Sequence, residues 1–394
     1  MVTQKQSRGA ARTRGSRKTR RAAARPPSDR VPNIRDVARR AGVSTATVSF
    51  VLNEAQRHRI LPRTQHRVFE AVRELNYSPN VLARNLAVGR SHILGVIVSD
   101  ISNPFFPEIV AAFQEAANLN EMEAIVMNTN YDAHRTKASV NRLLALQVPG
   151  VAILTSQVDP SIARALASRG ICAVYLDLGR AERCVSNIAV DYEQGITTAL
   201  EHVRALGHAR IGFIGGSPHL PSSQMRKAAF VAGAERAGGL ETMVVDSDFT
   251  VQGGYMACAK LLAGLRATAI LAANDLMAIG AMHAAYDRKI LIPGDLSVVG
   301  FDDIRFAQHT LPPLTTVAIP RSEIGRLAFQ TLHAMMTDPA RMGFEHRLQT
   351  NLIVRDSTAR AADSPPVRKQ RSFEGAPAPS RPVSAGVSDG PAPG

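Results

Sequence analysis

Side chains suited to binding a small polar ligand follow several predicted strands of this chain. Phe105 and Phe106 begin a helix after a proline turn, where exposed amides can bind polar groups and an aromatic face can stack on a ring. The residues in comparable positions are Asp177, Asp191, Arg226, Phe249, Asn274, Asp275, Asp302 and Asp303. These positions are the candidate lining of a binding site.

Several of these candidates also have a purely structural explanation. Phe105 and Phe106 could belong to the core, and simple helix capping explains Asn274 and Asp275 equally well. For Asp177 and Asp191 we favour a structural role, although Asp177 stays among the candidate binding residues.

Motifs for catalysis do not occur in the sequence. Gly215-Gly216-Ser217 lacks the second flanking glycine of a nucleophile elbow, and no phosphate-binding G-x-x-x-x-G-K-[ST] loop occurs. No G-x-G-x-x-G opens the first βα unit, the eleven histidines form no H-E-x-x-H pair, and the three cysteines form no C-x-x-C pair. We therefore expect no catalytic residue, no metal and no cofactor.

Alternating strands and helices from His92 onward would position the candidate side chains. The predicted strands are Ile93–Val98, Ala124–Met127, Val151–Leu154 and Ala173–Leu176, then Arg210–Ile214, Met243–Val245, Ala269–Ala272 and Val298–Gly300, and finally Arg347–Val354. The predicted helices are Phe105–Leu119, Arg135–Leu146, Ser161–Ala167, Gln194–Leu206, Gln224–Ala237, Gly253–Leu262, Leu276–Arg288 and Glu323–Met336. Repeated βα units predict doubly wound parallel sheets with ligands at the carboxyl ends of the strands. Two successive sets predict two lobes with a cleft between them.

A different pattern near the N-terminus predicts two short helices joined by a tight turn at Gly42. Apolar residues recur at helical spacing at Ile34, Val37, Ala38 and Ala41, and again at Val48, Val51 and Leu52. Asn33 and Ser44 are suited to cap the two helices. The pattern predicts a helix-turn-helix whose second helix presents to a partner the residues Thr45, Ala46, Ser49 and Phe50. An ordinary helical hairpin with a glycine turn is the alternative.

A third helix at Pro62–Leu75 and the run N-Y-S-P-N-V-L-A-R-N-L at Asn76–Leu86 follow this pair. In this order and spacing, Asn33–Leu86 resembles the headpiece and hinge of the lac repressor/galactose repressor family of bacterial transcriptional regulators. The resemblance implies a small all-α helix-turn-helix headpiece joined by a hinge helix to a two-lobed α/β domain. That domain would be like a periplasmic binding protein, with two doubly wound parallel sheets.

The resemblance also implies how the N-terminal part of the chain contacts DNA. Thr45, Ala46 and Phe50 would contact base edges in the major groove, and Leu86 would enter the minor groove from a hinge that becomes helical on DNA. The other expected DNA-binding residues are Asn33, Ser44, Thr47, Ser49, Asn53, Tyr77, Asn80, Ala83 and Arg84. The arginines of the third helix, Arg63, Arg67 and Arg73, would hold phosphates, as would Arg84. A plain linker is the alternative for the hinge.

In the cleft, the resemblance implies a role for four residues. Arg226 would be the arginine that contacts the effector, and Phe249 the aromatic platform. Asn274 would be the amide contact, and Asp302 the carboxylate that binds hydroxyl groups. These groups together suit a sugar or similar polyol. The expected effector-binding residues are Phe105, Phe106, Asp177, Arg226, Phe249, Asn274 and Asp302.

Positive charge is concentrated at one end of the chain. Residues 1–30 carry ten Lys and Arg with one acid, and residues 31–90 carry ten Arg with four acids, whereas the whole chain is +14. Residues 91–394 are therefore close to neutral, as expected if nucleic acid binds to the N-terminal part of the chain. A solvated tail is an equal alternative for residues 1–28.

We expect five segments. They are a disordered basic tail at 1–30, the headpiece at 31–78, the hinge at 79–90, the two-lobed effector-binding and dimerisation domain at 91–358 and a disordered tail at 359–394. Lobe one would hold about 91–190 and 318–342, and lobe two about 191–317 and 343–358. No apolar run approaches the ~20 residues of a membrane span, and no apolar block follows the N-terminal arginines. We expect a cytoplasmic, nucleoid-associated protein.

These observations predict a sequence-specific DNA-binding transcriptional regulator, most simply a repressor, controlled by a sugar or related metabolite bound between the lobes. One headpiece reads only a few base pairs of double-stranded DNA, so a homodimer on a palindromic operator is expected. A periplasmic sugar-binding protein would share the lobes but need a signal peptide and no headpiece. An architectural DNA binder without effector response is a third alternative.

Overall fold

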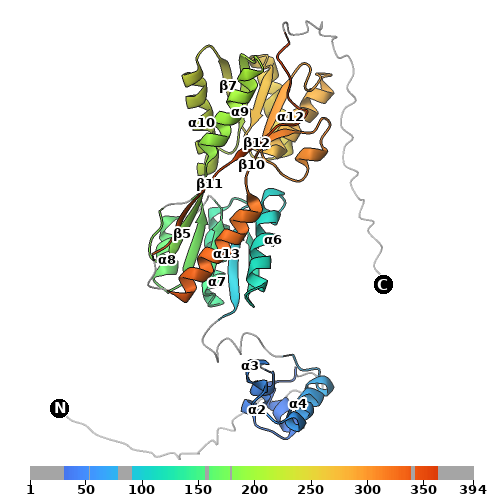
Figure 1. The fold of residues 1–394 in the computed structure, drawn as a ribbon, viewed down its shortest axis with the longest axis vertical. Helices are drawn as coiled ribbons and strands as arrows, with labels where there is room; N and C mark the ends of the chain where they lie inside the picture. Colours follow the sequence, from blue (N-terminus) through green and yellow to red (C-terminus); the bar gives the residue numbers. More distant parts are fainter. Residues whose placement is uncertain are drawn as a thin grey trace, which may run out of the picture. The chain divides into compact units, whose positions relative to one another are not determined.

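The computed structural model describes residues 31–52, 54–78, 91–155, 159–177, 180–338 and 342–362 (Figure 1). The chain divides into two compact units, Met1–Arg90 and Ser91–Gly394, so the boundary falls where the hinge was expected to end. The basic tail at 1–30 and the hinge at 79–90 lie outside the described residues. The C-terminal tail was expected to start at 359, but the chain is described to residue 362. Ala359 N donates to Ser297 Oγ, and Ala361 N donates to Leu206 O.

Within residues 31–52 and 54–78, the first unit has four helices around a small apolar core. They are α1 (Ile34–Ala41), α2 (Thr45–Leu52), α3 (Glu54–Arg57) and α4 (Pro62–Glu74). The core is formed by Val37, Ala38, Ala41, Val48, Val51, Val68 and Ala71. The predicted helix-turn-helix and third helix are confirmed, whereas α3 was not expected.

Local hydrogen bonds explain where the headpiece helices begin and end. Asn33 and Asp36 form a reciprocal capping box at the start of α1, and Gly42 ends the helix with φ +63°. Ser44 Oγ accepts from Thr47 N at 3.1 Å at the start of α2. Arg67 Nε donates to Ala41 O at 3.0 Å, so this guanidinium, expected to hold a phosphate, already binds the end of α1.

The second unit has two lobes, each built on a six-stranded sheet (Figure 1). The strands of lobe one, in sheet order, are β11 (Glu345–Leu348), β5 (Val185–Val190), β4 (Cys172–Leu176), β3 (Gly150–Leu154), β1 (Ile93–Val98) and β2 (Glu123–Asn128). Its helices are α6 (Phe105–Asn118), α7 (Ala133–Ala145), α8 (Pro160–Ala167) and α13 (Arg321–Thr337). Side chains of α6 and α13 share one core cluster with β1, whereas α7 and α8 pack in a second cluster. Since β1 contributes to both, the sheet is covered on both faces.

Lobe two repeats this arrangement. Its strands, in sheet order, are β12 (Asn351–Ile353), β10 (Thr315–Ala318), β9 (Ser297–Asp302), β8 (Ala269–Ala272), β6 (Arg210–Gly215) and β7 (Glu241–Asp246). Its helices are α9 (Tyr192–Ala205), α10 (Pro221–Ala237), α11 (Val251–Gly264), α12 (Asp275–Asp287) and the short 3-10 helix η1 (Ala307–His309). Only β12 runs antiparallel to its neighbour, so the remaining pairings are parallel as predicted.

Over the described strands, the chain passes between the lobes three times, after β5, after β10 and between β11 and β12. Strands β5 and β10 were not predicted, and the strand expected at Arg347–Val354 is two strands in different sheets. The predicted lobe boundary at residue 342 is therefore wrong, because Glu345–Leu348 pairs with β5 of lobe one. The change of sheet occurs after Leu348.

Close packing of α11 on α12 depends on a glycine. A Cβ on Gly280 would lie 1.9 Å from Val251 O, whereas a Cβ on the exposed Gly294 would meet nothing nearer than 3.6 Å. We expect Gly280→Ala to lower the free energy of unfolding by about 1–3 kcal/mol, because one helix must move away from the other. Gly294→Ala is the control and should unfold at the same urea concentration as the wild type. Equal midpoints for both variants would contradict the packing described.

Candidate functional site

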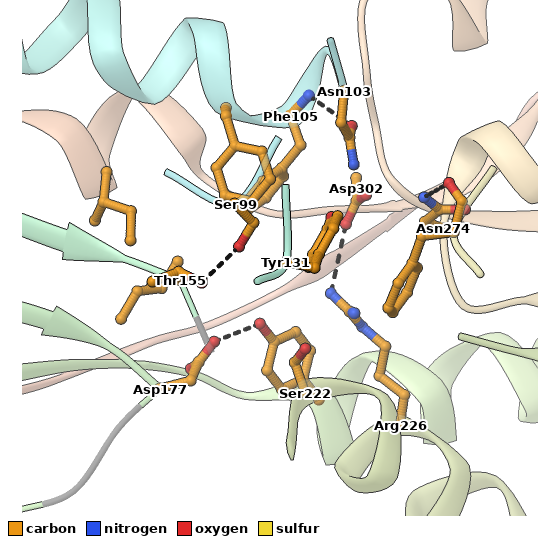
Figure 2. Close-up of a pocket in the computed structure, with 15 residues that line it drawn as sticks. Ser99, Asn103, Phe105, Tyr131, Thr155, Asp177, Ser222, Arg226, Asn274 and Asp302 are labelled. Carbon is orange, nitrogen blue, oxygen red and sulfur yellow. Dashed lines mark hydrogen bonds and ion pairs between the residues drawn. The ribbon is translucent and has the colours of Figure 1, made fainter. Parts of the chain in front are cut away.

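A cavity lies between the two lobes at the carboxyl ends of their parallel strands (Figure 2). The space between its lining atoms is about 500 Å³, and part of this space is open to solvent. All seven predicted effector-binding residues line it, namely Phe105, Phe106, Asp177, Arg226, Phe249, Asn274 and Asp302. The first three come from lobe one and the other four from lobe two, so a ligand here would touch both.

Arg226 and Asp302 face each other inside the cavity (Figure 2). The Arg226 Nη2 atom lies 3.6 Å from Asp302 Oδ1, and both residues are about 5% exposed. Aromatic rings hold the guanidinium, whose carbon lies 4.2 Å from the Tyr192 ring centre, 4.9 Å from that of Phe301 and 5.8 Å from that of Phe249. Cation–π attraction is strengthened when water is excluded, so these rings fix the arginine in place.

The polar groups of this pair are incompletely satisfied. Arg226 Nε and Asp302 Oδ1 are buried and have no hydrogen-bond partner in the described part of the chain. A buried donor or acceptor without a partner costs free energy, and native structures rarely contain one without a reason. A ligand hydroxyl can both accept from the arginine and donate to the carboxylate.

Burial also changes the acidity of Asp302. Loss of hydration raises its pKa from 3.8 to about 6, while the positive charges of Arg226 and Arg321 act in the opposite direction. A ligand that donates hydrogen bonds to this oxygen would favour the charged carboxylate.

Asp177 and Asp191 have the structural roles favoured from the sequence. Asp177 accepts from Val190 N at 2.8 Å and from Tyr192 Oη at 2.5 Å, which joins lobe one to lobe two beside the cavity. Burial raises the pKa of Asp177, and these two hydrogen bonds oppose the rise. Asp191 caps α9 and pairs with Arg347 at 2.9 Å, and it does not line this cavity.

Asn274 caps a helix and also lines the cavity. Its Oδ1 accepts from Met277 N at 2.9 Å, and its Nδ2 donates to Phe249 O at 3.1 Å. The capping explanation is therefore confirmed, and the amide holds the backbone that carries the Phe249 ring. That ring has room because Gly216 has no side chain, since a Cβ there would lie 2.1 Å from the ring.

Phe105 and Phe106 belong to the core and to the cavity lining at once. Both are buried, and their rings meet edge to face at 5.0 Å. Asn103 Oδ1 accepts from Phe105 N at 3.0 Å and so fixes the start of α6. The two explanations left open from the sequence are compatible.

Eight further lining residues were not predicted. They are Ser99, Asn103, Tyr131, Leu154, Thr155, Leu176, Tyr192 and Ser222. Ser99 and Thr155 directly follow β1 and β3, so the rule that ligands bind at strand ends could have found them. Tyr192 follows β5, a strand that was not predicted.

The exposed side of α2 carries four of the predicted DNA-binding residues, Thr45, Ala46, Ser49 and Phe50. Val48 and Val51 face the core, which leaves these four side chains available to a partner. Asn33 and Ser44 cap helices, Thr47 Oγ1 lies 2.9 Å from Ser44 Oγ, and Tyr77 packs on the core. The predicted residues that lie outside the described part of the chain are Asn53, Asn80, Ala83, Arg84 and Leu86.

Comparison with known proteins agrees with both units. The model of the lacI family of bacterial regulatory proteins matches residues 33–80, and that of a periplasmic binding protein-like domain matches residues 200–358. Catabolite control protein A of Priestia megaterium is 31% identical over 324 residues, which cover 80% of this chain and 97% of that protein. The chain belongs to the lacI family.

Two further comparisons extend this result. The ribose operon repressor of Escherichia coli is 32% identical over 330 residues, 82% of this chain and 97% of the repressor. The lac repressor dimer bound to operator and the anti-inducer ONPF has a TM-score of 0.72 and 30% identity, covering 84% of this chain and all of that one. The predicted fold class and the predicted family are confirmed.

As a lacI-family member, the protein is a DNA-binding transcriptional regulator with an effector-binding domain, and the family is non-enzymatic. The helix-turn-helix unit distinguishes it from a periplasmic sugar-binding protein. Within the described ranges, no helix is long and apolar enough to span a membrane, and no cluster of His, Cys, Asp or Glu could hold a metal ion.

The raised pKa of Asp302 predicts how stability depends on pH. Because the folded pKa of about 6 exceeds the ordinary aspartate value of 3.8, Asp302 favours folding below pH 3.8, and this contribution is lost as pH rises through 6. Relative to Asp302→Asn, the wild type should lose on the order of 3 kcal/mol across that window. Urea unfolding of both proteins at pH 4, 5, 6 and 7 measures the difference. A difference that stays constant with pH would contradict the assignment.

Proposed function

We propose that this protein is a repressor that binds a palindromic operator as a homodimer, with an affinity set by a sugar or related polyol in the interlobe cavity. The observation that carries the proposal is the buried pair Arg226 and Asp302, which has one donor and one acceptor without hydrogen-bond partners. A hydroxyl group supplies what both atoms need.

The other lining residues support an uncharged polyol. Phe105 and Phe249 supply flat apolar surfaces for the face of a sugar ring. Among the described lining residues, the charged ones are one arginine and two aspartates, Asp177 and Asp302, so a phosphorylated ligand would meet more negative than positive charge. Among the similar structures, a lacI-family regulator from Enterococcus faecium contains bound ribose, and the regulator CelR forms a complex with cellobiose.

The proposed DNA-reading surface is the exposed side of α2. Thr45 and Ser49 can donate to or accept from base edges, and Ala46 and Phe50 can contact a thymine methyl group. A phenylalanine cannot form the paired hydrogen bonds by which arginine reads guanine, so Phe50 favours an A·T pair at the position that it contacts.

Roles for the remaining predicted residues are part of the proposal. A hinge formed by residues 79–90 would place Asn80, Ala83 and Arg84 along the DNA backbone and Leu86 in the minor groove. The protein would act in the cytoplasm, associated with the nucleoid through its operators.

Ligand binding tests the cavity. In calorimetric titrations with a panel of free sugars, nucleosides and sugar phosphates, we expect one or more uncharged compounds to bind the wild type. Asp302→Asn and Arg226→Met should each weaken that binding by about 10- to 100-fold, since each removes a charged hydrogen-bond partner.

The control is Lys227→Met, which removes the neighbouring positive charge on α10. Lys227 pairs with Asp246 at 2.8 Å outside the cavity, so this variant should bind like the wild type. Absence of binding by every compound would favour an architectural DNA binder.

Operator selection tests the headpiece. From random duplex DNA, the full-length protein should select a twofold-symmetric sequence, and Phe50→Ala should bind it about 5- to 100-fold more weakly, with less preference at one position in each half-site. The control Leu61→Ala removes another large apolar side chain, 75% exposed at the start of α4. An equal loss in both variants, or none in Phe50→Ala, would contradict the proposed reading surface.

A further inference from the structure

The cavity wall at Asp302 has a backbone conformation that must be held in place. Asp302 has φ +107° and Asp303 has φ +53°, values that residues with a Cβ rarely adopt. Arg355 Nη2 donates to Asp303 Oδ1 at 2.7 Å, and Ile304 N donates to Asp275 Oδ2 at 2.7 Å. These contacts hold the turn from within lobe two.

A residue of the other lobe holds Asp302 itself. Arg321 is the first residue of α13, and its Nη1 donates to the carbonyl oxygen of Asp302. Helix α13 packs on α6 in lobe one, where the rings of Phe329 and Phe113 meet at 5.8 Å. The Arg321 side chain is 8% exposed, so the bond between the lobes is shielded from water.

The same guanidinium also binds α6. Arg321 Nε donates to Glu108 Oε2 at 2.9 Å, and the other Glu108 oxygen accepts from Ser322 Oγ at 2.9 Å. Glu108 lies in the first turn of α6, two residues after Phe106, the second of the two phenylalanines that line the cavity. One side chain therefore joins the peptide carrying the Asp302 carboxylate to the helix that forms the opposite wall.

We propose that Arg321 is a positioning residue that fixes the direction of the Asp302 carboxylate and couples it, through Glu108, to α6. This inference rests on the proposed function, because it states how a ligand held by Asp302 acts on lobe one. The planar guanidinium donates in two directions at once, whereas a lysine at this position would supply a single point charge.

Hydrogen–deuterium exchange of the full-length protein without ligand tests the connection directly. In Arg321→Met, amides of residues 300–306 and 105–112 should exchange about 3- to 10-fold faster, while exchange elsewhere in both lobes stays as in the wild type. Glu108→Gln should accelerate 105–112 in the same way and serves as a second variant if Arg321→Met folds poorly. Arg326→Met removes an exposed arginine of the same helix and should change neither segment.

Binding of the sugar identified by calorimetry supplies the second measurement. Arg321→Met should raise its Kd by about tenfold or more, Arg321→Lys should recover part of the loss, and Arg326→Met should bind normally. Unchanged exchange at 300–306 in Arg321→Met, or an even acceleration throughout both lobes, would overturn the inference. If no compound binds the wild type, the proposed function fails, while the exchange result still decides whether Arg321 links Asp302 to α6.

Discussion

A buried charge pair with incomplete hydrogen bonding is the interaction on which the rest of the larger unit depends. Arg226 and Asp302 are removed from water, and replacing such pairs by apolar residues often leaves stability unchanged or improves it. Stability alone therefore does not explain the pair. The pair lies in a cavity and has one donor and one acceptor without hydrogen-bond partners. A ligand that supplies these hydrogen bonds would explain why the pair is there.

Three connecting segments join the two lobes that form this cavity. The chain leaves one sheet and joins the other after β5, after β10 and between β11 and β12. Each lobe therefore has its own sheet, and the residues that line the cavity come from both lobes. A ligand can change the relation between the lobes only by as much as it binds one arrangement better than another. The bonds Tyr192–Asp177 and Arg321–Asp302 join the lobes beside the cavity, where a ligand could strengthen or disturb them.

Much of this structure is predictable because its signals are local. Apolar runs marked most strands, and capping residues with a glycine turn marked the headpiece. Strand β5 was missed because Ser186 and Asn187 interrupt its apolar run, and Ser186 finds its partners in Met335 and Phe344, far along the chain. Likewise, β11 (Glu345–Leu348) is mostly polar and is defined only by pairing with β5. The strand-end pattern and the resemblance together identified seven lining residues, and the sequence also suggested the helix cap at Asn274. The contact of the Tyr192 ring with Arg226 and the bond from the Asn274 amide to Phe249 O join residues far apart in the chain, so the sequence did not predict them.

The central claim is that a ligand completing the hydrogen bonds of Arg226 and Asp302 alters operator binding. Its most direct test is the Kd for the selected operator, measured at constant salt with and without a saturating amount of the sugar that binds, in the wild type and in Asp302→Asn. The account predicts a change of about fivefold or more in the wild type and none in the variant at the same sugar concentration. A sugar that binds the cavity and leaves the wild-type Kd unchanged, or shifts both proteins equally, would contradict it.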